Sequence, residues 1–138
     1  MIEMQKFLSR ESIIYCITRW ADYYECYPAM TAIVNSYETL RNEAGVAQKA
    51  KEIFESRSGI VLRLVEEGIK NGEFRSDIDG KSFSNIIWGS CIATTLEWRM
   101  KQRNFKIKER LLSTLDIILK TPDSISLLLS VKTPVCND

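Results

Sequence analysis

The most regular feature of the sequence is a 3.6-residue spacing of apolar side chains that stops between Ile69 and Asp79. Before the stop, apolar residues follow one face of a long helix and charged residues follow the other. The apolar stripe consists of Ala47, Ala50, Phe54, Val61, Leu64, Val65 and Ile69. Gly72 follows directly, and a glycine after a helical pattern is typical of a left-handed C-terminal cap. Asp79 can then cap the next helix through its carboxylate. The stretch IKNGEFRSDID is therefore predicted to be a reversal between two helices.

The helix predicted after this reversal is apolar on nearly every face. It covers the stretch KSFSNIIWGSCIATTLEWRM and ends near Met100. A helix with apolar residues all round is normally buried. A further apolar stripe runs from Ile107 to Leu119, and we expect Thr121-Pro122 to end it because proline lacks a backbone N–H.

The first part of the chain adds two helical patterns and no strand pattern. Apolar spacing runs from Ile13 to Tyr27, and Pro28 suits the first turn of a short helix that reaches Leu40. The sequence thus predicts an all-α fold of about five helices in one domain, residues 1–120. The tail, residues 121–138, contains an apolar run that is ambiguous between helix and strand.

Composition excludes several classes of protein. The net charge of +1 gives no overall attraction to nucleic acid or acidic lipid. The four cysteines lack the spacing of a zinc site or of a disulfide scaffold, so reduced thiols are expected. The sequence also shows no signal peptide and no apolar run long enough to span a membrane. These features favour a cytoplasmic protein without a membrane partner.

Catalysis has little support in the sequence. Histidine is absent, and no nucleophile elbow, phosphate-binding loop or paired carboxylates at metal-ligand spacing occur. We therefore expect no enzyme, no cofactor and no metal. The basic run from Lys101 to Arg110 fits either a nucleic-acid patch or a solvated turn, and without a groove-reading element the turn is favoured.

The order of these helices resembles the C-terminal domain of the tetracycline-repressor-like (TetR) family of transcriptional regulators. The most specific part is LVEEGIKNGEFRSDIDGKSFSNIIWGSCIATTLEW, Leu64 to Trp98, and Tyr23 to Glu38 is a weaker match. The similarity extends over about residues 10–120. It implies an effector-sensing and dimerisation domain, with a second copy of the chain and a small apolar or amphipathic effector as partners.

The family also has a DNA-reading helix-turn-helix, for which residues 1–12 are too short. We therefore expect contact with DNA only through such a domain outside this chain. The alternative is a stand-alone helical protein that binds a small apolar molecule or a partner helix and has no DNA-linked role.

The resemblance places the effector pocket among the helices of residues 10–27, 46–71 and 80–101. Its expected wall is apolar with a few hydroxyls, as binding pockets usually are. The candidate ligand-binding residues are Trp20, Tyr24, Phe54, Val61, Trp88, Cys91 and Thr95. The alternative is that these side chains simply fill the core, which helical spacing favours for any one of them.

The last two helices are the expected site of dimerisation. The helix of residues 82–100 is apolar on more faces than one protomer can cover, and the final stripe is too apolar to remain in water. A four-helix interface from two chains would bury both. The candidate interface residues are Ile107, Leu111, Leu112, Leu115 and Ile118.

Overall fold

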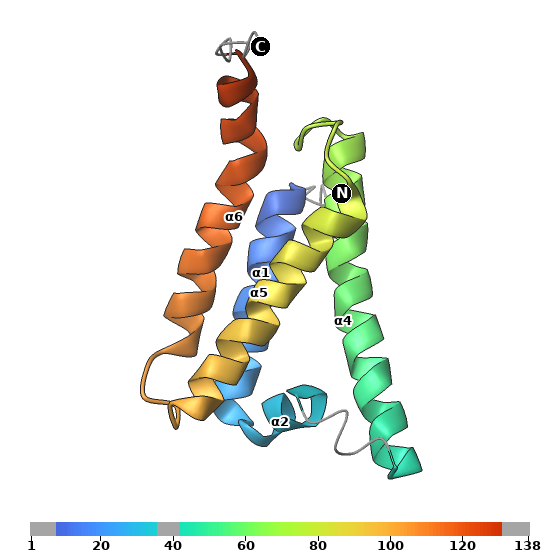
Figure 1. The fold of residues 1–138 in the computed structure, drawn as a ribbon, viewed down its shortest axis with the longest axis vertical. Coiled ribbons are helices and arrows are strands. Elements are labelled where there is room, and N and C mark those ends of the chain that lie inside the picture. The colour runs from blue at the N-terminus through green and yellow to red at the C-terminus, as the bar shows by residue number, and fades with distance from the viewer. Residues whose placement is uncertain (1–7, 36–41, 131–138) are drawn as a thin grey trace, which may run out of the picture.

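The computed structural model describes residues 8–35 and 42–130, and all the regular structure in these ranges is helical. The helices are α1 (Ser9–Cys26), α2 (Ala29–Asn35), α4 (Ala44–Lys70), α5 (Gly80–Met100) and α6 (Ile107–Ser130). Figure 1 shows the four long helices side by side, with α2 at the end where α1 finishes. The all-α prediction is confirmed. Leu40, the predicted end of the short helix, and Cys136, one of the four cysteines, lie outside the described residues.

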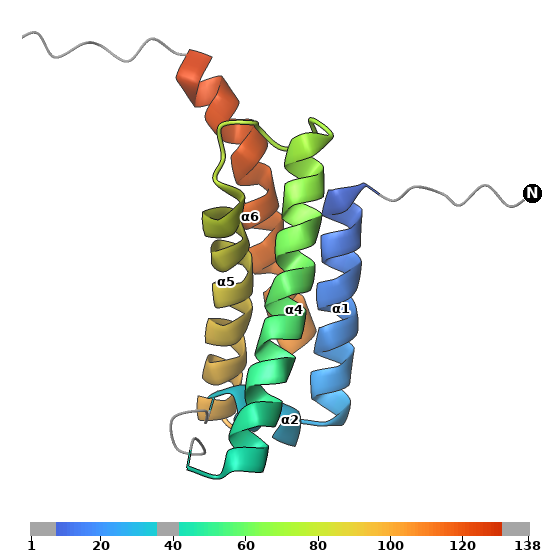
Figure 2. The same ribbon diagram turned by 90° about the vertical axis from the view of Figure 1, so that its right-hand side faces the viewer.

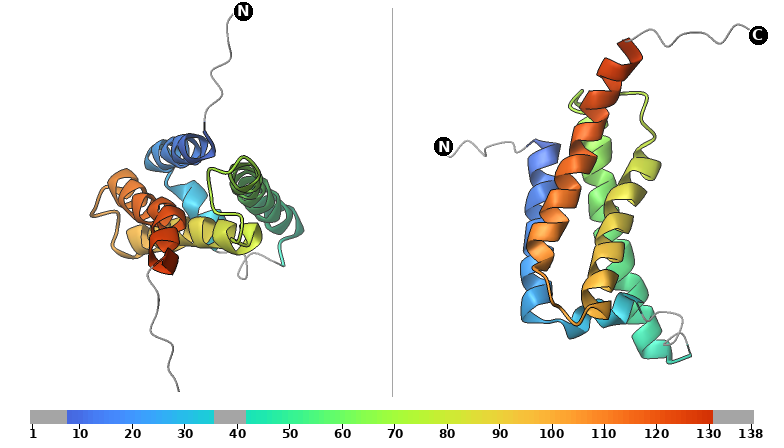
Figure 3. Two further views of the ribbon diagram at one scale, coloured as in Figure 1. Left: turned by 90° about the horizontal axis from the view of Figure 1, so that it is seen from above. Right: turned by 60° about the vertical axis from the view of Figure 1, so that its left-hand side comes forward.

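The long helices form a ring in which each contacts two neighbours. The order around the ring is α1, α4, α5, α6 and back to α1, as the view along the bundle shows (Figure 3, left). Successive helices run in opposite directions, so short connections suffice between neighbours (Figure 2). The centre of the ring is filled by side chains that are almost completely buried, among them Ile13, Ile17, Val65, Ile87 and Ile107.

The reversal between α4 and α5 has the geometry that its sequence predicts. Gly72 has a φ of +79°, the left-handed region that favours glycine. The N–H groups of Glu73 and Phe74 both donate to the carbonyl of Gly68, at 2.9 and 3.0 Å, which satisfies a carbonyl at the end of α4. Asp79 accepts a hydrogen bond from the backbone N–H of Ser82 at 3.1 Å and so caps α5. Hydrogen bonds from Ser82 also hold the pKa of the Asp79 carboxyl below its usual value.

The reversal also fixes the start of α1, which the sequence did not reveal. The backbone N–H groups of Ser9 and Arg10 donate to the two carboxylate oxygens of Glu73, at 2.8 and 2.9 Å. The residue before the helix, Leu8, offers no side-chain acceptor of its own. Glu73 therefore caps a helix that lies 64 residues earlier in the chain.

We expect Glu73→Ala to lower the free energy of unfolding by about 1 kcal/mol, the usual effect of losing an N-terminal cap. The substitution leaves two N–H groups of α1 without their acceptor. Urea denaturation followed by circular dichroism measures the difference, with Glu66→Ala at an exposed position of α4 as the matched control. Equal stability of the two variants would show that the Glu73 contacts contribute nothing.

The end of α6 differs from the prediction. The helix does not stop at Thr121-Pro122 but continues to Ser130, so that its last turns extend past the other helices (Figure 3, right). Proline removes one helical hydrogen bond and disfavours a helix interior by about 3 kcal/mol, but it does not forbid continuation. Three consecutive leucines, Leu127 to Leu129, follow it, and leucine is a good helix former. The predicted boundary was therefore wrong.

Within the described ranges, no helix combines the length and the apolar character that crossing a bilayer would require.

Candidate functional site

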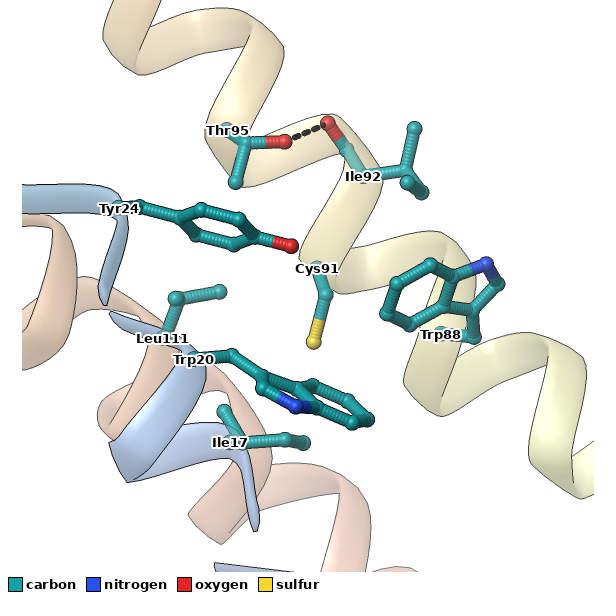
Figure 4. Close-up of a pocket in the computed structure, with 8 residues that line it drawn as sticks. All are labelled: Ile17, Trp20, Tyr24, Trp88, Cys91, Ile92, Thr95 and Leu111. Atoms are coloured by element: carbon teal, nitrogen blue, oxygen red, sulfur yellow. Dashed lines mark hydrogen bonds between the residues drawn. The ribbon is translucent and has the colours of Figure 1, made fainter. Parts of the chain in front are cut away.

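Aromatic and apolar side chains from α1, α5 and α6 enclose a small cavity (Figure 4). Its volume is about 10 Å³, which is room for about one water molecule. The lining residues are Ile17, Trp20, Tyr24, Trp88, Cys91, Ile92, Thr95 and Leu111. The structure therefore brings together five of the seven residues predicted to bind a ligand, in a conformation where they nearly fill the space between them.

Helical spacing explains why these side chains converge. Trp20 and Tyr24 are four residues apart on α1 and share one of its faces. Trp88, Cys91 and Thr95 occupy one face of α5 for the same reason. The rings of Trp20 and Trp88 meet edge to face with their centroids 5.5 Å apart, a favourable aromatic geometry.

The other two predicted ligand-binding residues do not line the cavity. Phe54, on α4, packs edge to face against Trp88 with centroids 5.8 Å apart, but 42% of it remains exposed. Val61, two turns further along α4, is 1% exposed and belongs to the central core. Sequence reasoning missed Ile17, Ile92 and Leu111. For two of them a signal was available, because Ile17 has helical spacing to Trp20 and Ile92 has helical spacing to Trp88.

The threonine hydroxyls on this part of α5 donate hydrogen bonds to carbonyls of their own helix. Thr95 donates to the carbonyl of Ile92 at 2.9 Å (Figure 4), and Thr94 donates to that of Ser90 at 2.8 Å. By contrast, the indole Nε1 of Trp88 is buried and has no hydrogen-bond partner among the described residues. In Figure 4 this nitrogen lies on the side of the ring away from Tyr24.

The cavity wall is uncharged at neutral pH. Burial raises the pKa of the Cys91 thiol to about 12. Burial also raises the pKa of Tyr24, although Arg57 beside it acts in the opposite direction. A protonated, buried thiol is a poor nucleophile, whereas an uncharged wall suits an apolar ligand.

One charged side chain touches the rim of the cluster. Arg57, on α4, is half-buried and donates a hydrogen bond to the hydroxyl of Tyr24. Its guanidinium carbon lies 5.0 Å from the ring centroid of Tyr24, 5.5 Å from that of Trp20 and 5.8 Å from that of Tyr23. The sequence prediction missed this residue, and its position three residues after Phe54 was the only available signal.

Three of the residues predicted for the dimer interface are buried within one chain. Ile107, Leu111 and Leu115 are 0%, 3% and 2% exposed and belong to the core. Leu112 and Ile118 are partly buried. Because these side chains pack inside the protomer, a second chain approaching α5 and α6 would meet mainly other residues.

The apolar residues that α5 and α6 do expose lie on their outer faces. Ile86, Leu96 and Met100 on α5 are 56%, 44% and 75% exposed, and Ile117 on α6 is 67% exposed. Gly89 and Ala93, also exposed, lie between them on α5 and allow close approach of another helix. We call this set, Ile86, Gly89, Ala93, Leu96, Met100 and Ile117, the outer face.

No group of three or more potential metal ligands occurs in the described part of the chain.

Comparison with protein families gives a match over most of the described chain. A family model described as "YsiA-like protein, C-terminal region" matches residues 13–121, from the first turns of α1 into α6. Neither the curated proteins nor the solved structures contain a match to the chain.

Proposed function

Because the chain belongs to the TetR family of transcriptional regulators, as a YsiA-like C-terminal region, we propose that it senses a small apolar or amphipathic effector and dimerises. DNA is then contacted by a helix-turn-helix domain and not by the helices described above. Such a protein works in the cytoplasm. The family resemblance of the sequence is confirmed by the match, while the effector and the dimer are the substance of the proposal.

The observation that carries the effector proposal is the convergence of Trp20, Tyr24 and Trp88 on an uncharged cavity. Aromatic walls with few polar groups are usual for small-molecule sites. An effector needs more room than a cavity of about 10 Å³ offers, so side chains of the wall must move when it binds. Trp20, which lines the cavity, is only partly buried, and Phe54, which packs on Trp88, is 42% exposed, so we expect these two side chains to be the ones that move. An effector would stabilise the conformation in which they have moved.

Thermal denaturation in the presence of apolar and amphipathic molecules tests this proposal. A ligand at 100 times its dissociation constant adds about 2.7 kcal/mol to the free energy of unfolding. For a domain of this size, that corresponds to a rise in melting temperature of roughly 10 °C. Binding should also change tryptophan fluorescence, since two of the three tryptophans belong to the cluster. The absence of both effects across alcohols, fatty acids, aromatic acids and their amides would contradict the effector proposal.

The dimerisation proposal is supported by the outer face. Ile86 and Met100 on α5, 56% and 75% exposed, and Ile117 on α6, 67% exposed, cost free energy in water, and they lie on the two helices that follow the α4–α5 reversal. A two-fold related copy would cover the same surface on both chains, which is the usual arrangement of a homodimer.

A further inference from the structure

Arg57 has an unusual environment for a half-buried charged residue. Its described contacts are the hydroxyl of Tyr24 and the rings of Trp20, Tyr23 and Tyr24, none of which carries a negative charge. No carboxylate of the described residues forms an ion pair with it. By contrast, Lys108 is paired with the carboxylate of Asp22 at 3.0 Å.

The hydrogen-bonding capacity of this guanidinium is mostly unused. Arginine has five N–H donors in a planar fork, and one of them is directed to Tyr24. The ring contacts orient the guanidinium through cation–π attraction but accept no conventional hydrogen bond. Such a fork matches the two oxygens of a carboxylate, which it binds with two parallel hydrogen bonds.

The same rings connect Arg57 to the cavity. Trp20 and Tyr24 contact the guanidinium and also line the enclosed space with Trp88 and Cys91. One end of the site is therefore cationic and the other apolar and uncharged. A molecule that extends from the cation into the cluster must have an anionic head and an apolar body.

The number of charges limits the kind of anion. None of the eight residues that line the cavity is charged, so Arg57 is the one cation that the described rim contributes beside these rings. One positive charge balances a monoanion, whereas a phosphate monoester or a larger polyanion would keep uncompensated charge next to an apolar wall.

We propose that Arg57 binds the carboxylate of the effector, and that the effector is a monocarboxylate with an apolar or aromatic body. This inference rests on the proposed effector function. The body occupies the space that opens when the ring of Trp20, now in edge-to-face contact with Trp88, moves outward, and the carboxylate accepts hydrogen bonds from the unused N–H donors of Arg57. Tyr24, held by the same guanidinium, positions the head above the cavity.

Matched pairs of ligands test the assignment. Phenylacetate and phenylacetamide share one body and differ in charge, as do decanoate and decanamide. We expect each carboxylate to bind the full chain about 10- to 100-fold more tightly than its amide, since a charge-assisted pair of hydrogen bonds is lost with the amide. Isothermal titration calorimetry gives the dissociation constants, and thermal denaturation provides an independent readout.

Two variants of Arg57 separate charge recognition from folding. Arg57→Gln should abolish the preference for the carboxylate while leaving amide binding within about threefold, a change of less than 1 kcal/mol. Arg57→Lys keeps the charge without the fork and should retain part of the preference. Arg63→Gln, at an exposed position of the same helix, is the control and should behave as the wild type.

The possible outcomes separate a failure of the Arg57 assignment from a failure of the effector site. Equal binding of carboxylate and amide, or a preference that survives in Arg57→Gln, overturns the role of Arg57 and leaves the effector site standing. Tighter binding of decyl phosphate than of decanoate overturns the monocarboxylate assignment. Failure of every carboxylate and every amide to bind contradicts the effector site itself.

Discussion

Gly68→Ala is expected to lower the free energy of unfolding by about 1–3 kcal/mol, the usual cost of overpacking a core. A Cβ at this position would lie 2.5 Å from two ring carbons of Phe74. That ring is 2% exposed and packs against Phe83 with centroids 5.6 Å apart, so it has little space to move. Since the Gly68 carbonyl also closes the α4–α5 reversal, a shift there would disturb the start of α5.

A matched control lies on the same helix. A Cβ at Gly59 would meet no atom within 4 Å, so Gly59→Ala should stabilise the chain by about 0.5–1 kcal/mol through helix propensity. Urea denaturation of both variants gives the two differences. If Gly68→Ala were as stable as Gly59→Ala, the close packing of Phe74 on α4 would be wrong.

The second large effect concerns dimerisation. The double variant Ile86→Glu, Leu96→Glu should remain folded, because both side chains are exposed in one chain. It should weaken the dimer by at least about 1000-fold, since it would place two unpaired carboxylates from each chain in the interface. Sedimentation velocity over a range of concentrations measures the change from dimer to monomer.

The control for this experiment places glutamates on other exposed apolar positions. Ile14 and Val46, 38% and 37% exposed, lie on α1 and α4, away from the outer face. Ile14→Glu, Val46→Glu should sediment as the wild type does. A double variant of Ile86 and Leu96 that still dimerises would exclude the outer face as the interface. Glutamate at Leu111 and Leu115 gives no comparable test, because both are buried in the core and the chain would unfold.

The sequence predicted the helices and the α4–α5 reversal well because the signals for them are local. Periodicity requires only neighbouring residues, and the caps at Gly72 and Asp79 act within one turn. The end of α6 was mispredicted, since a proline makes a helix less favourable at its position but does not prevent the helix from continuing. The role of Glu73 was missed because its partners, Ser9 and Arg10, are 64 and 63 residues away.

The candidate site was predictable in part for the same reason. Trp20 and Tyr24, like Trp88 and Cys91, share a helix face by spacing alone. Which helix faces pack against one another depends on how all four long helices are arranged, and this cannot be read from spacing within one helix. The stripe of Ile107, Leu111 and Leu115 fits a dimer interface and a protomer core equally well as a pattern, and the structure places it in the core. In the sequence, Arg57 resembles a charge exposed to solvent, because its hydrogen-bond partner Tyr24 is 33 residues away along the chain.

The central claim is that the effector binds in the cluster of Trp20 and Trp88. The chain has three tryptophans, and each gives a separate indole N–H signal in a ¹H–¹⁵N correlation spectrum. Trp98 is the internal control, since its Nε1 donates to the carbonyl of Phe105 at 3.0 Å, near the connection between α5 and α6. On titration with a ligand that raises the melting temperature, the signals of Trp20 and Trp88 should move and that of Trp98 should not. Movement of the Trp98 signal with those of Trp20 and Trp88 unchanged would contradict the account.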